Sequence, residues 1–236
     1  RAIELDPDFV IAKLYLADKV REFDDERALR LWNDVLSADL SRLSPRERLL
    51  IERARAIQEK RFDDAEQMLD GYLEDHPDDP FVIHRNALNC WITGDFDEAE
   101  RLNRRLIEIA PNWVIAYNQL GYIAMSRGRF VEAEEYFKSY RFIAPDQANP
   151  HDSLGELYII MGRYDEARET LNRALEIKPD FWAAYDHLAI MTAFSGDVEG
   201  PREVAERLRA AGGPDKQAFA IDCLAHSMEL RNAEAW

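Results

Sequence analysis

The sequence is poor in the residues on which many small folds depend. Only 2 cysteines and 10 glycines occur in 236 residues. Cys90 and Cys223 lie far apart, with neither CxxC nor metal-ligand spacing, which argues against a disulfide scaffold and favours a reducing compartment. We expect both to be buried in helices. No stretch approaches the roughly 18 apolar residues of a membrane span, and residues 1–8 lack the apolar block of a signal peptide. These absences predict a soluble, cytoplasmic protein.

Positive charge is also scarce. The chain has 30 Lys plus Arg against 46 Asp plus Glu, a formal net charge of −16, and its pI is near 4.8. Contacts to phosphates and to anionic membranes need Lys and Arg, so this balance argues against both nucleic-acid and membrane partners. The apolar and charged fractions, 47% and 32%, are nevertheless typical of a folded domain and not of a disordered tail.

The sequence instead contains an internal repeat with a period of 34 residues. Prolines, aromatics, alanines and glycines all recur at this spacing. The recurring positions are Pro77, Pro111, Pro145 and Pro179; Phe62, Phe96, Phe130 and Tyr164; Ala65, Ala99, Ala133 and Ala167; and Gly94, Gly128, Gly162 and Gly196. Several residue types in one register indicate stacked structural repeats and make a single globular core improbable.

Each repeat reads as two short antiparallel helices. In the unit 114–147, apolar residues follow helical spacing up to residue 125, stop at 126–129 and resume until Pro145. Gly121 and Ala133 would let the two helices approach closely, and a large side chain there should cost on the order of 1–3 kcal/mol. Since one helix pair cannot bury its apolar face alone, we predict an all-α solenoid of stacked pairs.

The repeat resembles the tetratricopeptide repeat. One unit carries the family's signature of an aromatic residue, Leu-Gly, Ala, Phe and Pro at Tyr117, Leu120, Gly121, Ala133, Phe137 and Pro145. The next unit repeats most of this signature, with Leu154, Gly155, Tyr158, Ala167, Ala174 and Pro179. Departures occur at His151, at Asn86-Ala87 and at Pro201. The resemblance implies a right-handed superhelix of antiparallel helix pairs.

These patterns divide the chain into five segments. We expect the end of a truncated preceding repeat at 1–8, an irregular helix pair of the same type at 9–45, four regular units at 46–181, a degenerate unit at 182–215 and a capping helix at 216–236. Residues 2–7 parallel residues 174–179, which favours a piece of a longer protein. Residues 43–52, followed by regular repeats, are similar to the repeat portion of bacterial multidomain regulators.

Catalytic and cofactor motifs are missing from the sequence. It has no phosphate-binding loop, no dinucleotide fingerprint and no H-E-x-x-H helix. His151, Asp152 and Ser153 are consecutive, so on a helix they would point about 100° apart and could not act as a triad. Asp152 and His187 could meet across adjacent repeats, but no nucleophile or third ligand accompanies them. We therefore predict no enzymatic activity, no metal and no cofactor.

The family resemblance also implies a binding surface, because the first helix of each pair lines a concave groove. Two named subtypes do not fit: the carboxylate clamp of chaperone-binding members and the asparagine ladder of glycosyltransferase-linked members are both missing. The groove positions change from aromatic and apolar to acidic along the chain. They are Phe81, His84, Trp91, Asn118, Tyr122, Met125, Asn149, Asp152, Glu156, Asp186 and Ile190.

A groove of this composition would suit an extended or helical peptide with an apolar or aromatic anchor and basic residues. The partner could be another protein or another domain of the same full-length chain, which makes a protein-interaction scaffold the first hypothesis. Two alternatives stay open. Phe81 and Trp91 could simply pack against neighbouring helices while the acidic residues are solvated, and the repeats could self-associate into a homo-oligomer through the ends of the solenoid.

Overall fold

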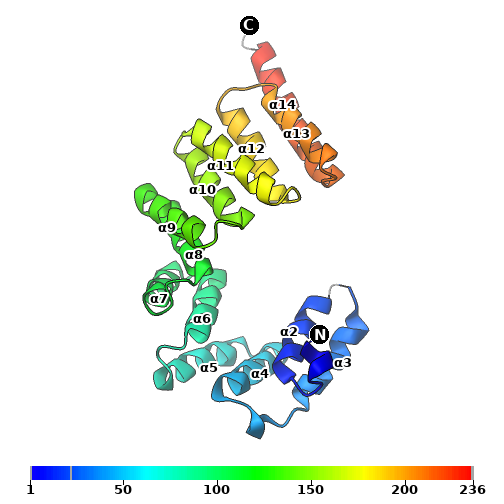
Figure 1. Cartoon of the computed structure of the whole chain (residues 1–236), viewed down its shortest axis with the longest axis vertical. Coiled ribbons are helices and arrows are strands. Elements are labelled where there is room, and N and C mark those ends of the chain that lie inside the picture. The colour runs from blue at the N-terminus through cyan, green and yellow to red at the C-terminus, as the bar shows by residue number, and fades with distance from the viewer. Residues whose placement is uncertain (1, 22, 235–236) are drawn as a thin grey trace. The chain divides into compact units, whose positions relative to one another are not determined.

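The structure, a computed structural model, describes residues 2–21 and 23–234. Over these residues it contains α-helices and one 3₁₀-helix, in an order in which neighbours along the chain pack as antiparallel pairs (Figure 1). The chain forms two compact units, residues 1–102 and residues 103–236, and α7 (Phe96–Ile109) crosses the boundary between them. The prediction of an all-α fold built from helix pairs is confirmed.

The first unit contains six α-helices and a 3₁₀-helix. They are α1 (Ala2–Leu5), α2 (Val10–Val20), α3 (Asp25–Leu36), η1 (Leu40–Arg42), α4 (Pro45–Gln58), α5 (Phe62–Asp75) and α6 (Pro80–Thr93). Helix α2 packs on α3, α4 on α5, and α5 on α6. One core cluster includes Leu14, Trp32 and Ile51, and a second is formed by Leu49, Leu69 and Val82.

Local signals fix where two first-unit helices begin. Ser44 caps α4 through a reciprocal capping box, in which the Glu47 amide donates to Ser44 Oγ (3.3 Å) and the Ser44 amide donates to Glu47 Oε2 (2.9 Å). Asp79 caps α6 by accepting from the amides of Phe81 (3.0 Å) and Val82 (3.3 Å). Each cap satisfies amides that have no partner within the helix, and so stabilises the start of its helix.

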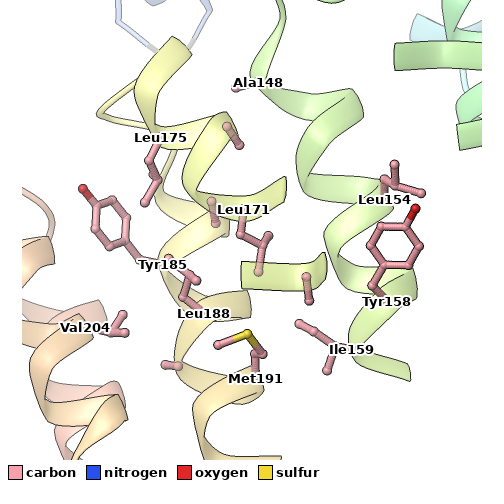
Figure 2. Packing of buried hydrophobic residues seen from close by; sticks show 14 of the residues in the cluster. Ala148, Leu154, Tyr158, Ile159, Leu171, Leu175, Tyr185, Leu188, Met191 and Val204 are labelled. Atoms are coloured by element: carbon pink, nitrogen blue, oxygen red, sulfur yellow. The ribbon is translucent and has the colours of Figure 1, made fainter. Parts of the chain in front are cut away.

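The second unit contains seven further helices. They are α8 (Val114–Ser126), α9 (Phe130–Ile143), α10 (Ala148–Ile160), α11 (Tyr164–Ile177), α12 (Trp182–Phe194), α13 (Gly200–Ala210) and α14 (Asp215–Glu234). Each packs on the next from α8 to α14, and α10 also contacts α12. Figure 2 shows the apolar side chains of Leu171, Leu188 and Met191 lying between α10, α11 and α12. This continuous core holds α8, α10 and α12 in place within the second unit.

Close helix approach depends on the glycines that the sequence pattern singled out. A Cβ on Gly121 would lie 2.7 Å from two ring carbons of Phe137, and a Cβ on Gly155 would lie 2.7 Å from Leu171 Cγ. Both distances are well below normal carbon contacts of about 3.5–4.0 Å. The expectation for Gly121 is confirmed: a side chain there would collide with the second helix of its own pair.

The turns between paired helices use a left-handed residue. Gly94, Gly128, Gly162 and Gly196 have φ between 71° and 86°, a region open to glycine without steric cost. The equivalent position in the unit 46–79 is Lys60, whose φ is 60°. Lys60 is the non-glycine residue with positive φ among those described, so this turn carries strain that its counterparts lack.

A proline lies at the start of α13, the second helix of the unit that was expected to be degenerate. α13 begins at Gly200, with Pro201 in its first turn, where a missing amide hydrogen costs no helical hydrogen bond. α14 begins at Asp215, and residues 235 and 236 of the expected capping segment lie outside the described residues. Within the described part of the chain, no helix combines the length and apolar character required to cross a membrane.

The two cysteines differ in their surroundings. Cys223 is exposed on α14, so the expectation that it is buried is wrong: its position faces away from the helix that α14 covers. Cys90 is half-buried on α6. Burial and nearby carboxylates, Glu98 first among them, raise the pKa of the Cys90 thiol to about 11, which keeps it protonated and unreactive at neutral pH.

Candidate functional site

A chain of polar side chains connects the first helices of successive pairs in the second unit. Ser153 Oγ on α10 donates to Asn118 Oδ1 on α8 (3.1 Å). Tyr122 Oη on α8 donates to Glu156 Oε2 on α10 (2.8 Å) and lies 3.3 Å from Ser153 Oγ. We call these four residues, together with Asp152 and His187, the α8–α10–α12 network.

The network continues from α10 to α12 through a histidine. His187 Nδ1 donates to Asp152 Oδ1 (2.8 Å), and His187 Nε2 lies 3.8 Å from Glu156 Oε2. The Asp152 side chain is only 5% exposed, whereas that of Glu156 is 29% exposed. His187 therefore occupies a pocket formed by two carboxylates, one buried and one reaching solvent.

The electrostatics of the network follow from this burial. Burial alone would lower the pKa of His187, but the hydrogen bond to Asp152 and the charges of Asp152, Glu156 and Asp186 outweigh it and raise the pKa above its ordinary value. Burial and the Glu156 carboxylate raise the pKa of Tyr122, so its hydroxyl stays a donor. The Tyr122 ring is held by an edge contact with Phe137, with centroids 5.2 Å apart.

Repeat spacing explains why these side chains meet. The contacts join residues 31, 34 and 35 positions apart, one repeat along the chain, so equivalent faces of successive first helices come together. Asn118, Tyr122, Asp152 and Glu156, which the family resemblance places in one groove, do lie in one network. Ser153 and His187 were not among the expected groove residues, although their repeat positions are those of an asparagine ladder in related subtypes.

The remaining second-unit candidates have other surroundings. Asn149 Nδ2 donates to Tyr140 Oη on α9 (3.1 Å), so its amide is used at the junction between two pairs. Met125 is half-buried against the main core cluster. Asp186 is half-buried on α12 beside His187, on which its charge acts. The acidic candidates are therefore partly or fully buried and not simply solvated.

The three candidates on α6 belong to the first unit. Phe81 packs against both core clusters of that unit and lies under the Arg46 guanidinium, 5.7 Å from the ring centroid. Trp91 makes an edge contact with Phe96, 5.4 Å between centroids. Burial and the charge of Arg85 lower the pKa of His84. Phe81 thus has the packing role that the sequence left open as an alternative.

The polar groups of the network are mostly paired with one another. Ser153 has its hydroxyl hydrogen directed to an amide oxygen, not to a histidine that could activate it. Among the residues that the structure describes, no three His, Cys, Asp or Glu side chains are grouped so that they could hold a metal ion. The network consists of two carboxylates, an amide, a phenol, a hydroxyl and an imidazole.

Comparison with known families bears directly on the central helices. The family model of the tetratricopeptide repeat matches residues 114–180, which span α8, α9, α10 and α11. This part of the chain consists of tetratricopeptide repeats. No curated protein matches the sequence, so the other comparisons that bear on the fold are with solved structures.

Solved structures extend this repeat fold over more of the chain. A tetratricopeptide repeat protein from Parabacteroides merdae is 15% identical over 95% of this chain and 87% of its own, with a TM-score of 0.66. MamA from Desulfovibrio magneticus RS-1 is 17% identical over 69% of this chain and 90% of its own (TM-score 0.59). YrrB, described as having an unusual peptide-binding site, is 20% identical over 78% and 94% (TM-score 0.52). At these identities the likeness establishes the fold and no more.

Proposed function

We propose that the second unit is a protein-interaction module that binds a basic, partly apolar segment of a partner protein across α8, α10 and α12. The observation that carries the proposal is the α8–α10–α12 network, which aligns polar and acidic side chains from three successive first helices. The peptide-binding site reported for YrrB supports the same use of this fold. The module would serve as a scaffold or as the regulatory part of a longer chain.

The charges on this face favour a cationic ligand. Asp152, Glu156 and Asp186 contribute three carboxylates, against which the network supplies only the imidazole of His187. Glu156 accepts one hydrogen bond, from Tyr122, and a carboxylate has room for several more. A Lys or Arg side chain of the partner would therefore find a partly exposed acceptor at Glu156.

The network can also orient the backbone of the bound segment. Asn118 accepts from Ser153 through Oδ1, which fixes the amide so that its nitrogen is available as a donor to a peptide carbonyl. Met125 is half-buried near the same helix face and offers an adaptable apolar contact for an anchor side chain. Affinity would then come from a few anchors, as in other protein interfaces.

The proposal is tested by removing charge without changing shape. The variant Glu156→Gln with Asp186→Asn neutralises two carboxylates on the proposed face. Its matched control is Glu169→Gln with Asp165→Asn, which removes the same charge from exposed positions on α11. Partners captured from a lysate of the native host by the wild-type protein are identified by mass spectrometry, and their affinities for each variant are then measured.

We expect the network variant to weaken binding of the captured partner at least tenfold and to reduce the dependence of affinity on salt. The control should stay within about threefold of wild type, because its charges act only through screened solvent. If the network variant and the control bind the partner with the same affinity, the assignment of this face is contradicted.

Self-association remains a second candidate, favoured by exposed apolar side chains on one second helix. Val131 and Phe142 on α9 are 73% and 86% exposed, and such residues can mark a contact surface. Sedimentation velocity over a hundredfold range of concentration distinguishes the candidates. A constant monomer mass would eliminate assembly as the main role, whereas a rising mass that Phe142→Ser abolishes would favour it.

A further inference from the structure

A cavity in the first unit has the opposite charge to the rest of the protein. It has a volume of about 480 Å³ and is lined by residues of α2, α3, α4, α5 and α6. Four cationic side chains line it, and none of the described residues that line it is Asp or Glu. In a chain with a formal net charge of −16, a concentration of this kind is unexpected on composition. The cations are Arg21, Arg53, Lys60 and Arg85.

Two buried donors of this cavity have no acceptor. Arg53 is 8% exposed, and its Nε lies buried without a hydrogen-bond partner. Trp32 is 6% exposed, and its Nε1 is also buried without a hydrogen-bond partner. A buried polar group without a partner is destabilising, and a buried unpaired charge more so. Because both orphan atoms are donors, a ligand that satisfies them must bring an acceptor.

The surroundings of Arg53 make an anionic acceptor the natural choice. Within the described residues, the Arg53 side chain has no ion pair or hydrogen bond. The like charge of Arg85 acts on it, and the attraction of Glu66 is weaker than this repulsion. Glu66 itself accepts from Asn89 Nδ2 (2.8 Å). A carboxylate can accept two hydrogen bonds from one guanidinium and would offset the Arg53–Arg85 repulsion as well.

The backbone holds a third cation at this cavity despite strain. Lys60 stands where the other units have glycine and keeps φ at 60°, a left-handed conformation that is sterically unfavourable for an L-residue with a side chain. Strained residues persist where the surroundings or the function require them. Here the consequence of lysine in place of glycine is one more positive charge on the cavity wall.

The rim of the cavity is apolar and exposed. Tyr15, Ile57 and Phe62 line it with 45%, 38% and 58% of their surface exposed. A small ion would leave these side chains in water, whereas a peptide could cover them while it places an acid inside. The volume is within the range of pockets that hold drug-sized groups and suffices for one or two side chains.

We propose that this cavity binds an acidic segment of a partner protein, in which a carboxylate contacts Arg53 and Arg85 and a neighbouring aromatic or branched apolar side chain packs against Tyr15, Ile57 and Phe62. The site is separate from the α8–α10–α12 network and takes a ligand of the opposite charge. Its charge complementarity and its orphan donors both specify the ligand chemistry.

The experiment is a selection followed by a matched comparison. A random peptide library displayed on phage is selected against the full chain, and a fluorescein-labelled consensus peptide is then titrated by fluorescence anisotropy. The site variants are Arg53→Met and Arg85→Met, which keep side-chain length and remove the charge. The control is Arg48→Met, which removes an exposed cation of the same helix, α4, outside the cavity.

We expect consensus peptides that carry Asp or Glu beside an aromatic or branched residue. Arg53→Met and Arg85→Met should each weaken binding at least tenfold, and Arg48→Met less than threefold. Replacing the peptide carboxylate by its amide should cost as much as Arg53→Met, and the two changes combined should cost little more than either, because they remove one interaction.

Other outcomes overturn the proposal. Selected peptides without acidic residues, or equal binding by wild type and Arg53→Met, would do so directly. If no peptide is selected while 1-anilinonaphthalene-8-sulfonate binds the wild type and loses affinity in Arg53→Met, the occupant is a small organic anion instead. If circular dichroism shows that Arg53→Met does not fold, peptide binding is compared instead between wild type, Arg85→Met at a half-buried position and Lys60→Gly at an exposed one. Glu156→Gln with Asp186→Asn should leave this binding unchanged, which separates failure here from failure of the proposed function.

Discussion

The contact between Gly121 and Phe137 allows a stability change to be worked out from the structure. In Gly121→Ala, the new methyl carbon would lie 2.7 Å from two ring carbons of Phe137, about 1 Å closer than carbon atoms normally approach. Phe137 is fully buried in an interior packed as densely as an organic crystal. The ring cannot withdraw freely, so either α8 or α9 must shift.

Two opposing contributions set the size of the effect. Overpacking of a filled core costs about 1–3 kcal/mol, whereas alanine is better than glycine inside a helix by about 1 kcal/mol. Gly71 on α5 isolates the second contribution, since it is exposed and a Cβ there would meet nothing within 4 Å. We therefore expect Gly71→Ala to stabilise by about 1 kcal/mol and Gly121→Ala to be about 1–3 kcal/mol less stable than Gly71→Ala.

The measurement must report on each repeat separately, because repeat proteins need not unfold in one step. Hydrogen exchange followed by mass spectrometry does so through peptides from residues 62–75 and 114–143. Protection should rise in the first segment of Gly71→Ala and fall in the second segment of Gly121→Ala. A second substitution, Phe137→Leu, should recover part of the loss in Gly121→Ala. If Gly121→Ala gains protection as Gly71→Ala does, the close-packing argument is wrong.

Three further predictions concern charged groups. The raised pKa of His187 means that its ion pair with Asp152 stabilises the second unit fully below about pH 6.5 and progressively less as pH rises through the raised pKa; urea unfolding at several pH values should show this decline, and His187→Gln should remove it. Lys60→Gly should stabilise the first unit by about 1 kcal/mol, because it relieves backbone strain. The same variant should bind the selected acidic peptide more weakly. Unchanged stability would argue against the strain. Arg53→Met should raise the melting temperature by removing a buried donor without a partner, worth about 1–3 kcal/mol, and a lowered melting temperature would show that Arg53 is satisfied in solution.

The sequence predicts the helix pairs well because the repeat supplies the same evidence several times. The recurring glycines at 94, 128, 162 and 196 all adopt the same left-handed turn, and Ser44 and Glu47, three residues apart, form a capping box. The contacts that join Asn118, Tyr122, Asp152 and Glu156 in one network also fit the repeat spacing, since residues about one period apart occupy equivalent faces.

Other features depend on contacts that periodicity does not encode. Burial of Asp152 against His187 needs the distance between α10 and α12, and the aromatic Phe81 fits a groove anchor and a core residue equally well by pattern. The cationic cavity has one sequence signal, the lysine at position 60 in place of glycine, but its importance emerges only with Arg53 and Arg85 placed beside it. Exposure of Cys223 likewise depends on which face of α14 covers α13.

The hydrogen bonds between α8, α10 and α12 also constrain the length of the repeat. They join residues such as Asn118 and Ser153, or Asp152 and His187, which are 35 positions apart. Deleting one residue from a connecting turn would rotate the following helix by about 100° relative to its neighbour or pull it about 1.5 Å along its axis. Either displacement would separate the network partners that lie on opposite sides of the shortened turn. In these central repeats, a change in the number of residues should therefore disrupt the network far more than a single side-chain substitution. Natural variants should contain substitutions here but no insertions or deletions.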